Sequence, residues 1–185
     1  ISGIDASGKG HVASGLTAAL AAADLRVALI GLGGFMRRPS ERFAPRDPGG
    51  HFYRHAFRFD ELFGSLVLPL RDKRSWRFEA RAADRVYSFE RIDVVLLEGI
   101  FLLKRELRAH YDVSFWIDCT FATALERAIA REQDGMDPDE TRSAYGSIYF
   151  PAQALHFERD DPKAAANHVV VNDPRLAEAP LGLLA

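Results

Sequence analysis

The chain has 185 residues, of which 48% are hydrophobic and 27% charged, and its formal net charge is −2. These values are typical of one globular domain, residues 1–185, and argue against a nucleic-acid or membrane-surface binder, which needs a basic excess. No apolar run reaches the ~18 residues of a membrane span, and no signal-peptide pattern is present. The single cysteine, Cys119, excludes an intramolecular disulfide and favours a cytoplasmic location.

The first dozen residues have the spacing of a phosphate-binding loop, or Walker A motif. Gly3, Gly8 and Lys9 stand at the G-x-x-x-x-G-K positions. Glycines let backbone N–H groups approach phosphate oxygens, and a lysine supplies a charge for the outer phosphates. An ordinary strand-to-helix turn that happens to contain a lysine is the less favoured alternative. The predicted nucleotide-binding residues are Gly3, Asp5, Ala6, Ser7, Gly8, Lys9, Gly10 and His11.

A helix is predicted directly after the loop, with an apolar stripe at Val12, Leu16, Ala19 and Leu20. The positive end of its dipole would point at bound phosphates. One position departs from the usual loop pattern. The residue after the lysine is normally Ser or Thr, whose hydroxyl holds Mg²⁺, and here it is Gly10. The sequence therefore predicts a phosphate site without that hydroxyl ligand.

Short apolar runs alternate with helical patterns along the rest of the chain, which predicts an α/β fold with a parallel sheet and helices on both faces. The strands should be buried on both faces and carry the active site at their carboxyl ends. Thr120 and Asp137 are expected as helix N-caps. We expect residues 71–91 to be irregular and residues 173–185 to form a surface tail. Strands are expected at 26–32, 92–99, 113–118 and 167–171, and helices at 51–70, 103–110, 121–133 and 138–158.

Glu98 ends the most strand-like segment and is followed by Gly99. A carboxylate there is costly to bury unless it faces a cleft or a cation. In phosphate-loop proteins an acid at the end of a neighbouring strand orders Mg²⁺ and its waters. We therefore predict that Glu98 is the metal residue and lies within direct or water-mediated reach of Lys9. The alternative is a carboxylate that only caps the turn at Gly99.

Four motifs together resemble the uridine kinase and phosphoribulokinase-like family of P-loop kinases. They are the phosphate loop and residues 56–60, 97–103 and 149–153, in the right order between Gly3 and Asn172. The resemblance implies a three-layer α/β/α fold of the P-loop NTPase type with a five-stranded parallel sheet. It also implies ATP and Mg²⁺ as cofactors, and phosphorylation of a hydroxyl on a nucleoside, such as uridine, or a similar small molecule.

The resemblance also assigns roles to single residues. Lys9 and Glu98 match the family's phosphate loop and its strand-end acid. Arg127 and Arg131 match its arginine-bearing lid and would face the same phosphates. For these two arginines, an exposed helix face with a Glu–Arg pair is an equally weighted alternative.

Two departures concern the acceptor side. The family's second strand ends in an acid just before an aromatic, and that acid takes the acceptor proton; here Gly33 stands at this position. Asp5 is the candidate to replace part of this catalytic role, or it is a loop carboxylate that accepts backbone N–H groups. The substrate hairpin of the family is reduced to remnants in residues 76–91. The predicted substrate residues are Phe35, Asp60, Asp84, Arg85 and Tyr87.

Three functions are compatible with these patterns. The first is an ATP-dependent kinase for a nucleoside-like acceptor. The second is a catalytically weak nucleotide-binding protein, which Gly10 and Gly33 favour. The third is a kinase for a sugar phosphate or another small alcohol, which a basic loop would favour (Arg37, Arg38, Arg42 and Arg46). The expected partners are a nucleotide and a small-molecule acceptor, with no nucleic acid and no membrane, and a homo-oligomer is left open.

Overall fold

The computed structural model describes residues 1–80, 85–132 and 135–177. Its strands are β1 (Ser2–Gly3), β2 (Val27–Gly31), β3 (Trp76–Ala80), β4 (Arg85–Phe89), β5 (Val94–Glu98), β6 (Phe115–Asp118) and β7 (His168–Val171). Its α-helices are α1 (Lys9–Ala22), α2 (Pro39–Arg42), α3 (Pro48–His55), α4 (Phe59–Glu61), α5 (Leu68–Lys73), α6 (Phe121–Ala130), α7 (Pro138–Ala144), α8 (Phe150–Asp160), α9 (Pro162–Ala165) and α10 (Pro174–Ala177). Two 3₁₀ turns (Leu32–Phe35 and Arg105–His110) and two wider π-helical turns (Leu62–Val67 and Tyr145–Tyr149) complete the described elements.

The strands that carry the core pair in parallel, as the sequence predicts. β1 pairs with β6 and β6 with β7, and β2 pairs with β5 in a register that places Gly31 opposite Glu98. A single parallel bridge between Ser2 and Gly99 links the two groups. The expected five-stranded sheet is not confirmed: these strands form a three-stranded sheet, β1–β6–β7, and a separate two-stranded sheet, β2–β5.

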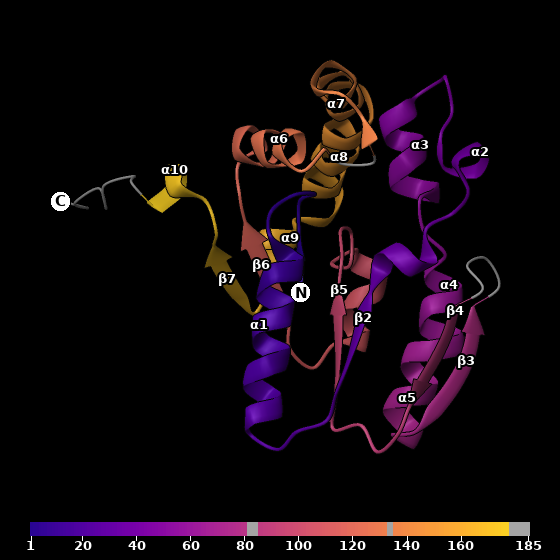
Figure 1. Ribbon diagram of the computed structural model, residues 1–185. Coiled ribbons are helices and arrows are strands. Elements are labelled where there is room, and N and C mark those ends of the chain that lie inside the picture. Colours follow the sequence, from indigo (N-terminus) through magenta and orange to yellow (C-terminus); the bar gives the residue numbers. More distant parts are fainter. Residues whose placement is uncertain (81–84, 133–134, 178–185) are drawn as a thin grey trace.

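The carboxyl ends of β1, β2 and β5 open toward the end of the molecule where α3, α6, α7 and α8 gather (Figure 1). Helix α1 runs back along the strands from this end, and the β3–β4 hairpin lies beside α5 away from it (Figure 1). In the part of the chain that the structure describes, no helix has both the length and the apolar character that crossing a bilayer demands.

Both predicted N-caps are confirmed. The Thr120 side chain accepts the backbone N–H of Thr123, and the Asp137 side chain accepts those of Asp139 and Glu140. The predicted stripe of α1 is partly wrong, since Ala19 is exposed and the buried positions of the helix are Lys9 and Ala13. Small Ala13 faces inward because α1 lies close to the parallel strands β2 and β5.

The predicted continuous helix over residues 51–70 is wrong. The chain is helical to His55, leaves the helix at residues 56–58, and continues as α4, the Leu62–Val67 turn and α5. At the break, Phe57 bridges Met36, and the backbone N–H of Arg58 donates to the Phe35 carbonyl at 2.9 Å. Pairing with the chain after β2 therefore replaces the helical hydrogen bonds, although the apolar spacing of threes and fours continues. Residues 105–110 form a 3₁₀ turn in place of the expected short helix.

The expectation that residues 71–91 are irregular is also wrong. β3 and β4 form an antiparallel hairpin with Trp76 opposite Phe89 and Phe78 opposite Tyr87. Trp76 and Phe78 of β3 lie on the same face as Tyr87 and Phe89 of β4, so this face carries four aromatic rings, although charged residues alternate with them in β3. That face packs on Phe35, whose ring lies 6.4 Å from Phe78 and 5.7 Å from Tyr87.

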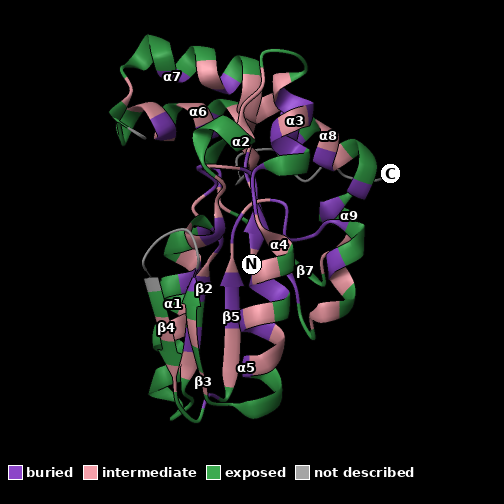
Figure 2. Cartoon of the chain, turned by 90° about the vertical axis from the view of Figure 1, so that its right-hand side faces the viewer, coloured by how far each residue is buried: buried purple, intermediate pink, exposed green. Residues whose placement is uncertain are grey.

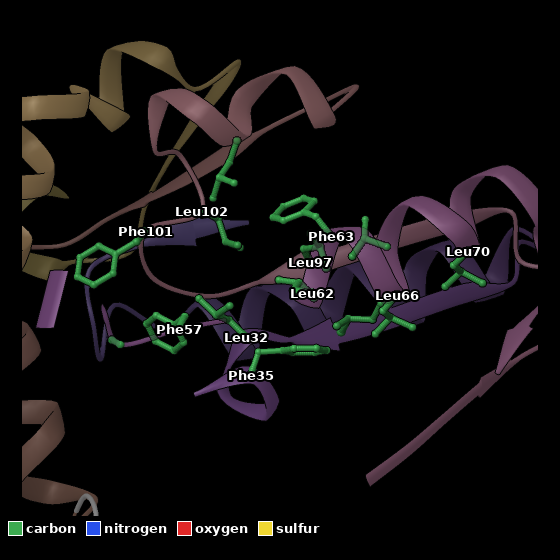
Figure 3. Close-up of a cluster of buried hydrophobic side chains, with 14 of the residues drawn as sticks. Leu32, Phe35, Phe57, Leu62, Phe63, Leu66, Leu70, Leu97, Phe101 and Leu102 are labelled. Atoms are coloured by element: carbon green, nitrogen blue, oxygen red, sulfur yellow. The ribbon is translucent and has the colours of Figure 1, made fainter. Parts of the chain in front are cut away.

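The main core lies between this face, β2, β5 and the helical segment from α3 to α5. Figure 3 shows Leu32, Phe35, Leu62 and Leu66 among its fully buried side chains. A smaller cluster around Trp116 and Tyr145 lies under α6 and α8. The residues of β5 are buried or half-buried, whereas most residues of α7 are exposed (Figure 2).

Burial of the strands on both faces is not complete. On β2, Leu29 is 37% exposed, and on β7, Val169 and Val171 are 44% and 53% exposed. Both strands lie at an edge, where no further strand covers them. The tail prediction is wrong at its first residue, since Asp173 is buried, and α10 follows it; residues 178–185 lie outside the described part.

Candidate active site

The phosphate loop connects β1 to α1 and has the backbone that its glycines predict. Gly8 has a φ of 92°, and a Cβ there would collide with the Asn172 side chain. A Cβ at Gly3 would lie 2.7 Å from the carbonyl oxygen of Ile117. Ala6 also has a positive φ of 56°, which an L-residue with a Cβ adopts only under strain. The two glycines are therefore required by close approach and by conformation.

Lys9 is folded back onto the loop. Its ammonium donates to the Ile4 carbonyl at 2.7 Å, and only 7% of the residue is exposed. Burial lowers the pKa of Lys9, while the charges of Asp5 and Glu98 act in the opposite direction. The lysine charge is thus held beside the loop, in an environment where an anionic ligand would stabilise it.

A cavity of about 660 Å³ opens at the carboxyl ends of the strands. The phosphate loop and His11 form one wall, and Arg127, Arg131 and Asn172 lie on the same side. The cavity also has an apolar part, which is lined by Leu32, Met36, Phe57 and Ile100, together with Gly33. Phosphate-binding groups and an apolar chamber therefore share one space.

Glu98 lines this cavity, as the sequence predicts for a strand-end acid. Its Oε1 faces Gly31 on the neighbouring strand, where a Cβ would lie 3.2 Å away. Among the described residues, no hydrogen bond or ion pair joins Glu98 to Lys9, although the Glu98 charge raises the pKa of Lys9. The sequence predicts either a direct or a water-mediated contact between Glu98 and Lys9. The two residues line the same cavity, but the direct contact is not formed.

The loop carbonyl of Ser7 is held from two sides. The Asn172 amide donates to it at 2.7 Å, and the Arg127 guanidinium donates to it at 3.3 Å. Asn172 directly follows β7, and Arg127 belongs to α6. Asp173, which follows Asn172 in the chain, accepts the backbone N–H of Thr120 at 2.7 Å and the hydroxyl of Thr123 at 2.7 Å. These contacts fix α6, and with it Arg127 and Arg131, relative to the phosphate loop.

Asp5 is engaged in a second set of contacts. Its Oδ1 accepts the N–H of Ala6 at 2.9 Å, and its Oδ2 accepts the Tyr145 hydroxyl at 2.5 Å. Its own N–H donates to the Gln153 Oε1 at 3.0 Å. These are the contacts of a loop carboxylate that organises its own backbone, which was the alternative to a catalytic role.

The two glycines that depart from the family pattern leave open space. No atom lies within 4 Å of a Cβ built at Gly10 or at Gly33, and Gly33 lines the cavity. Within the described ranges, no three His, Cys, Asp or Glu side chains gather as a metal site. Mg²⁺ commonly takes one or two carboxylates and completes its shell with phosphates and water. Glu98, whose carboxylate lines the cavity, fits that mode of binding.

The predicted substrate residues do not gather at the cavity. Phe35 is fully buried against Phe78 and Tyr87, and Tyr87 packs against it from the hairpin. Asp60 is exposed at the start of α4. Asp84 lies outside the described residues, and of Arg85 only the backbone is described. None of Phe35, Asp60 and Tyr87 lines the cavity.

Sequence reasoning missed several residues that do reach the site. Met36 and Phe57 line the apolar wall, Asn172 lines the other side, and Tyr145 and Gln153 hold the loop from behind. Asn172 carries a usable signal, because it follows a predicted parallel strand at its carboxyl end. Phe57 and Gln153 belong to the motifs 56–60 and 149–153, but the motifs alone assign them no contact, and nothing in the local pattern around Met36 and Tyr145 points to the site.

No protein-family model matches the chain. Solved structures do. A possible uridine kinase from Bacillus stearothermophilus superposes with a TM-score of 0.65 at 18% identity, over 91% of this chain and 84% of that one. A candidate fructose transport system kinase from Silicibacter sp. TM1040 gives 0.64 at 24% identity, over 91% and 86%. The YGR205w protein gives 0.58 at 9% identity, over 93% and 84%. The chain therefore has the α/β fold of these three proteins, two of which are named as kinases.

Proposed function

We propose that this chain is an ATP-dependent phosphotransferase that phosphorylates a hydroxyl of a nucleoside, such as uridine, or of a related small molecule. The observation that carries the proposal is the shared cavity, in which the phosphate loop, Lys9, Glu98 and two arginines face an apolar chamber. The solved structures with this fold include proteins named as kinases, which supports the same class of reaction.

The nucleotide would bind along the phosphate loop. The backbone N–H groups from Gly8 onward lie at the start of α1, where the helix dipole favours negative charge. Lys9 would exchange the Ile4 carbonyl for a phosphate oxygen, and its burial would strengthen that contact. Arg127 and Arg131 line the cavity on the same side and would stabilise charge on the transferred group.

Glu98 is the residue that would hold Mg²⁺, which would neutralise negative charge on the phosphates. In the transfer, the acceptor oxygen bonds to the γ-phosphorus and the bond from that phosphorus to the β–γ bridging oxygen breaks. ADP leaves, and the hydroxyl proton passes to a cavity carboxylate or to water. The transition state is loose, so positioning and charge stabilisation supply most of the rate.

The acceptor chamber supports a neutral acceptor. Its wall consists of Leu32, Met36, Phe57 and Ile100, and no arginine of the basic loop lines it. Arg37 pairs with Glu41 at 3.6 Å, and Arg42 donates to the Arg37 carbonyl at 3.2 Å. Arg37 and Arg42 are thus engaged within their own loop, which weakens the support for a sugar-phosphate acceptor.

A catalytically weak nucleotide-binding protein is the second candidate. Gly33 provides no side chain to take the acceptor proton, and Asp5 is held by Ala6 and Tyr145. This candidate predicts ATP binding with little acceptor-dependent turnover, because loss of a general base typically costs about 10²- to 10⁴-fold.

The test measures ATP·Mg²⁺ binding by calorimetry and ADP release with a series of nucleosides, sugars and sugar phosphates. We expect tight ATP binding that Lys9→Ala weakens strongly, and ADP release that depends on a neutral acceptor. Binding without acceptor-dependent release would select the second candidate. Equal ATP affinity in the parent and in Lys9→Ala would contradict both.

A further inference from the structure

The phosphate loop contains a strained backbone conformation at position 6, where the sequence has an alanine and not a glycine. Ala6 has a φ of 56°, in the left-handed region that residues with a Cβ rarely adopt, and it is buried. Such a conformation persists only where the surrounding structure holds it. The Ala6 N–H donates to Asp5 Oδ1 at 2.9 Å, so the Asp5 carboxylate is the group that fixes this peptide.

Asp5 is in turn held by the helical segment that crosses behind the loop. The Tyr145 hydroxyl donates to Asp5 Oδ2 at 2.5 Å, and Tyr145 has no exposed surface. Burial and the neighbouring Asp5 charge raise the pKa of Tyr145, so its hydroxyl stays protonated and donates. The contact joins residues 140 positions apart in the sequence.

Gln153 makes the second contact from the same segment. Its Oε1 accepts the Asp5 N–H at 3.0 Å, and it is 2% exposed. Among the described atoms its Nε2 has no hydrogen-bond partner, which is a cost that an apolar residue would avoid. A buried glutamine is therefore useful here mainly for its contact with the loop.

We propose that Tyr145 and Gln153 are positioning residues that hold Asp5 and, through it, the strained phosphate loop in the shape that binds nucleotide. The inference rests on the proposed function. Asp5 then acts as a structural carboxylate and not as the proton acceptor, since both of its oxygens and its N–H are committed to the loop and to the helix behind it.

The binding test is a double-mutant cycle on nucleotide affinity. Tyr145→Phe removes only the donor to Asp5, and we expect it to weaken ATP·Mg²⁺ binding by about tenfold, as for a lost hydrogen bond to a charged group. Glycine adopts the left-handed region at no steric cost. In a protein that already carries Ala6→Gly, adding Tyr145→Phe should therefore weaken ATP·Mg²⁺ binding by only about twofold or less.

Tyr111→Phe is the matched control. The Tyr111 hydroxyl donates to the Leu102 carbonyl at 2.8 Å, and the residue does not line the nucleotide cavity. It should lower thermal stability about as much as Tyr145→Phe while leaving ATP affinity unchanged. If Tyr145→Phe and Tyr111→Phe bind ATP equally well, or if glycine at position 6 restores nothing, the proposal is wrong.

Hydrogen exchange separates this proposal from the proposed function. In the ligand-free protein, the amide of Ala6 should exchange faster in Tyr145→Phe than in the parent, and Tyr111→Phe should leave it unchanged. If the amide exchanges faster in Tyr145→Phe but the parent binds no ATP, the positioning role is retained and the kinase is rejected. Unchanged exchange in Tyr145→Phe would reject the positioning role whether or not ATP binds.

Discussion

Gly33 is the residue whose replacement most directly tests the acceptor side. It lines the cavity, and no atom lies within 4 Å of a Cβ built there, so a longer side chain can enter. We expect Gly33→Asp to raise kcat for acceptor phosphorylation by about tenfold or more, because it supplies a general base. The measurement is ADP release with uridine and other acceptors, in parent and variant.

Gly33→Asn is the control for this change, because it has nearly the same shape and cannot take a proton. It should leave kcat near the parent value while ATP affinity is kept in both variants. A parent that already turns over at about 1–100 s⁻¹, the ordinary kinase range, would show that another residue takes the proton. An unchanged rate in Gly33→Asp with ATP still bound would show that the acceptor is not positioned beside this glycine.

Cys119 gives a second prediction at this scale. Burial raises the pKa of its thiol to about 11, although Arg127 acts to lower it. The reactive thiolate is therefore scarce at pH 8, and we expect alkylation to be slow in the native protein and fast in urea. The rate should rise with pH up to about 11. Fast native alkylation at pH 8 would contradict the burial of Cys119.

Among the connections between elements, the buried carboxylate of Asp173 joins the segment after β7 to the start of α6. It accepts hydrogen bonds from Thr120, from Thr123 and from the backbone of Arg175. Asp173→Ala would remove the acceptor of the buried Thr123 hydroxyl and of the half-buried Thr120, and we expect a loss of about 2 to 4 kcal/mol in the free energy of unfolding. Asp139→Ala is the control, since the Asp139 side chain is 94% exposed and should change stability by less than about 1 kcal/mol.

This contribution depends on pH in a defined direction. Burial alone would raise the pKa of Asp173, but the hydrogen bonds from Thr120 and Thr123 outweigh it and hold the pKa below its ordinary value. The stabilisation is therefore present above the unfolded pKa of about 3.9 and is lost as the pH falls below it. Urea unfolding of parent and Asp173→Ala should differ clearly at pH 7 and by less at pH 3, with the difference still narrowing as the pH falls further. An equal difference at both values would contradict this assignment.

How far the elements follow from sequence depends on what decides each one. The phosphate loop and the caps at Thr120 and Asp137 are local, so their residue types and spacing predict them. The hairpin at residues 76–89 was not predicted, because each of its strands has only two alternating aromatic residues, and the pattern becomes clear only when the two strands are paired. The break near Phe57 depends on pairing with Met36, about twenty residues away, which no local pattern contains.

The same distinction applies to the candidate site. Glu98 was placed correctly in the cavity because the end of a buried parallel strand is a local signal. The placement of Phe35 near the acceptor came from resemblance and is not supported, since the ring fills the core under the hairpin. Tyr145 could not be found from sequence, because its role depends on a contact with Asp5 across most of the chain.

For the whole molecule, nucleotide should act as a stabilising ligand. A ligand that binds only the folded state at 100 times its Kd adds about 2.7 kcal/mol of stability. For a chain of this size we expect ATP·Mg²⁺ to raise Tm by about 5 to 10 °C. The rise in Tm should be smaller in Lys9→Ala. For each protein, the rise is the Tm with ATP·Mg²⁺ minus the Tm without it. A shift of equal size in both proteins would place the nucleotide away from the phosphate loop.

The π-helical turn at Tyr145–Tyr149 has a consequence for how the chain could vary in length. Seven residues of a regular α-helix turn through about 700°, close to two full turns, whereas eight turn through about 800°. Tyr145 and Gln153 are eight residues apart and still contact the same aspartate, because the wider turn between them takes up one additional residue. A chain lacking the exposed Ser147 could therefore form an unbroken α-helix and keep both side chains facing the phosphate loop.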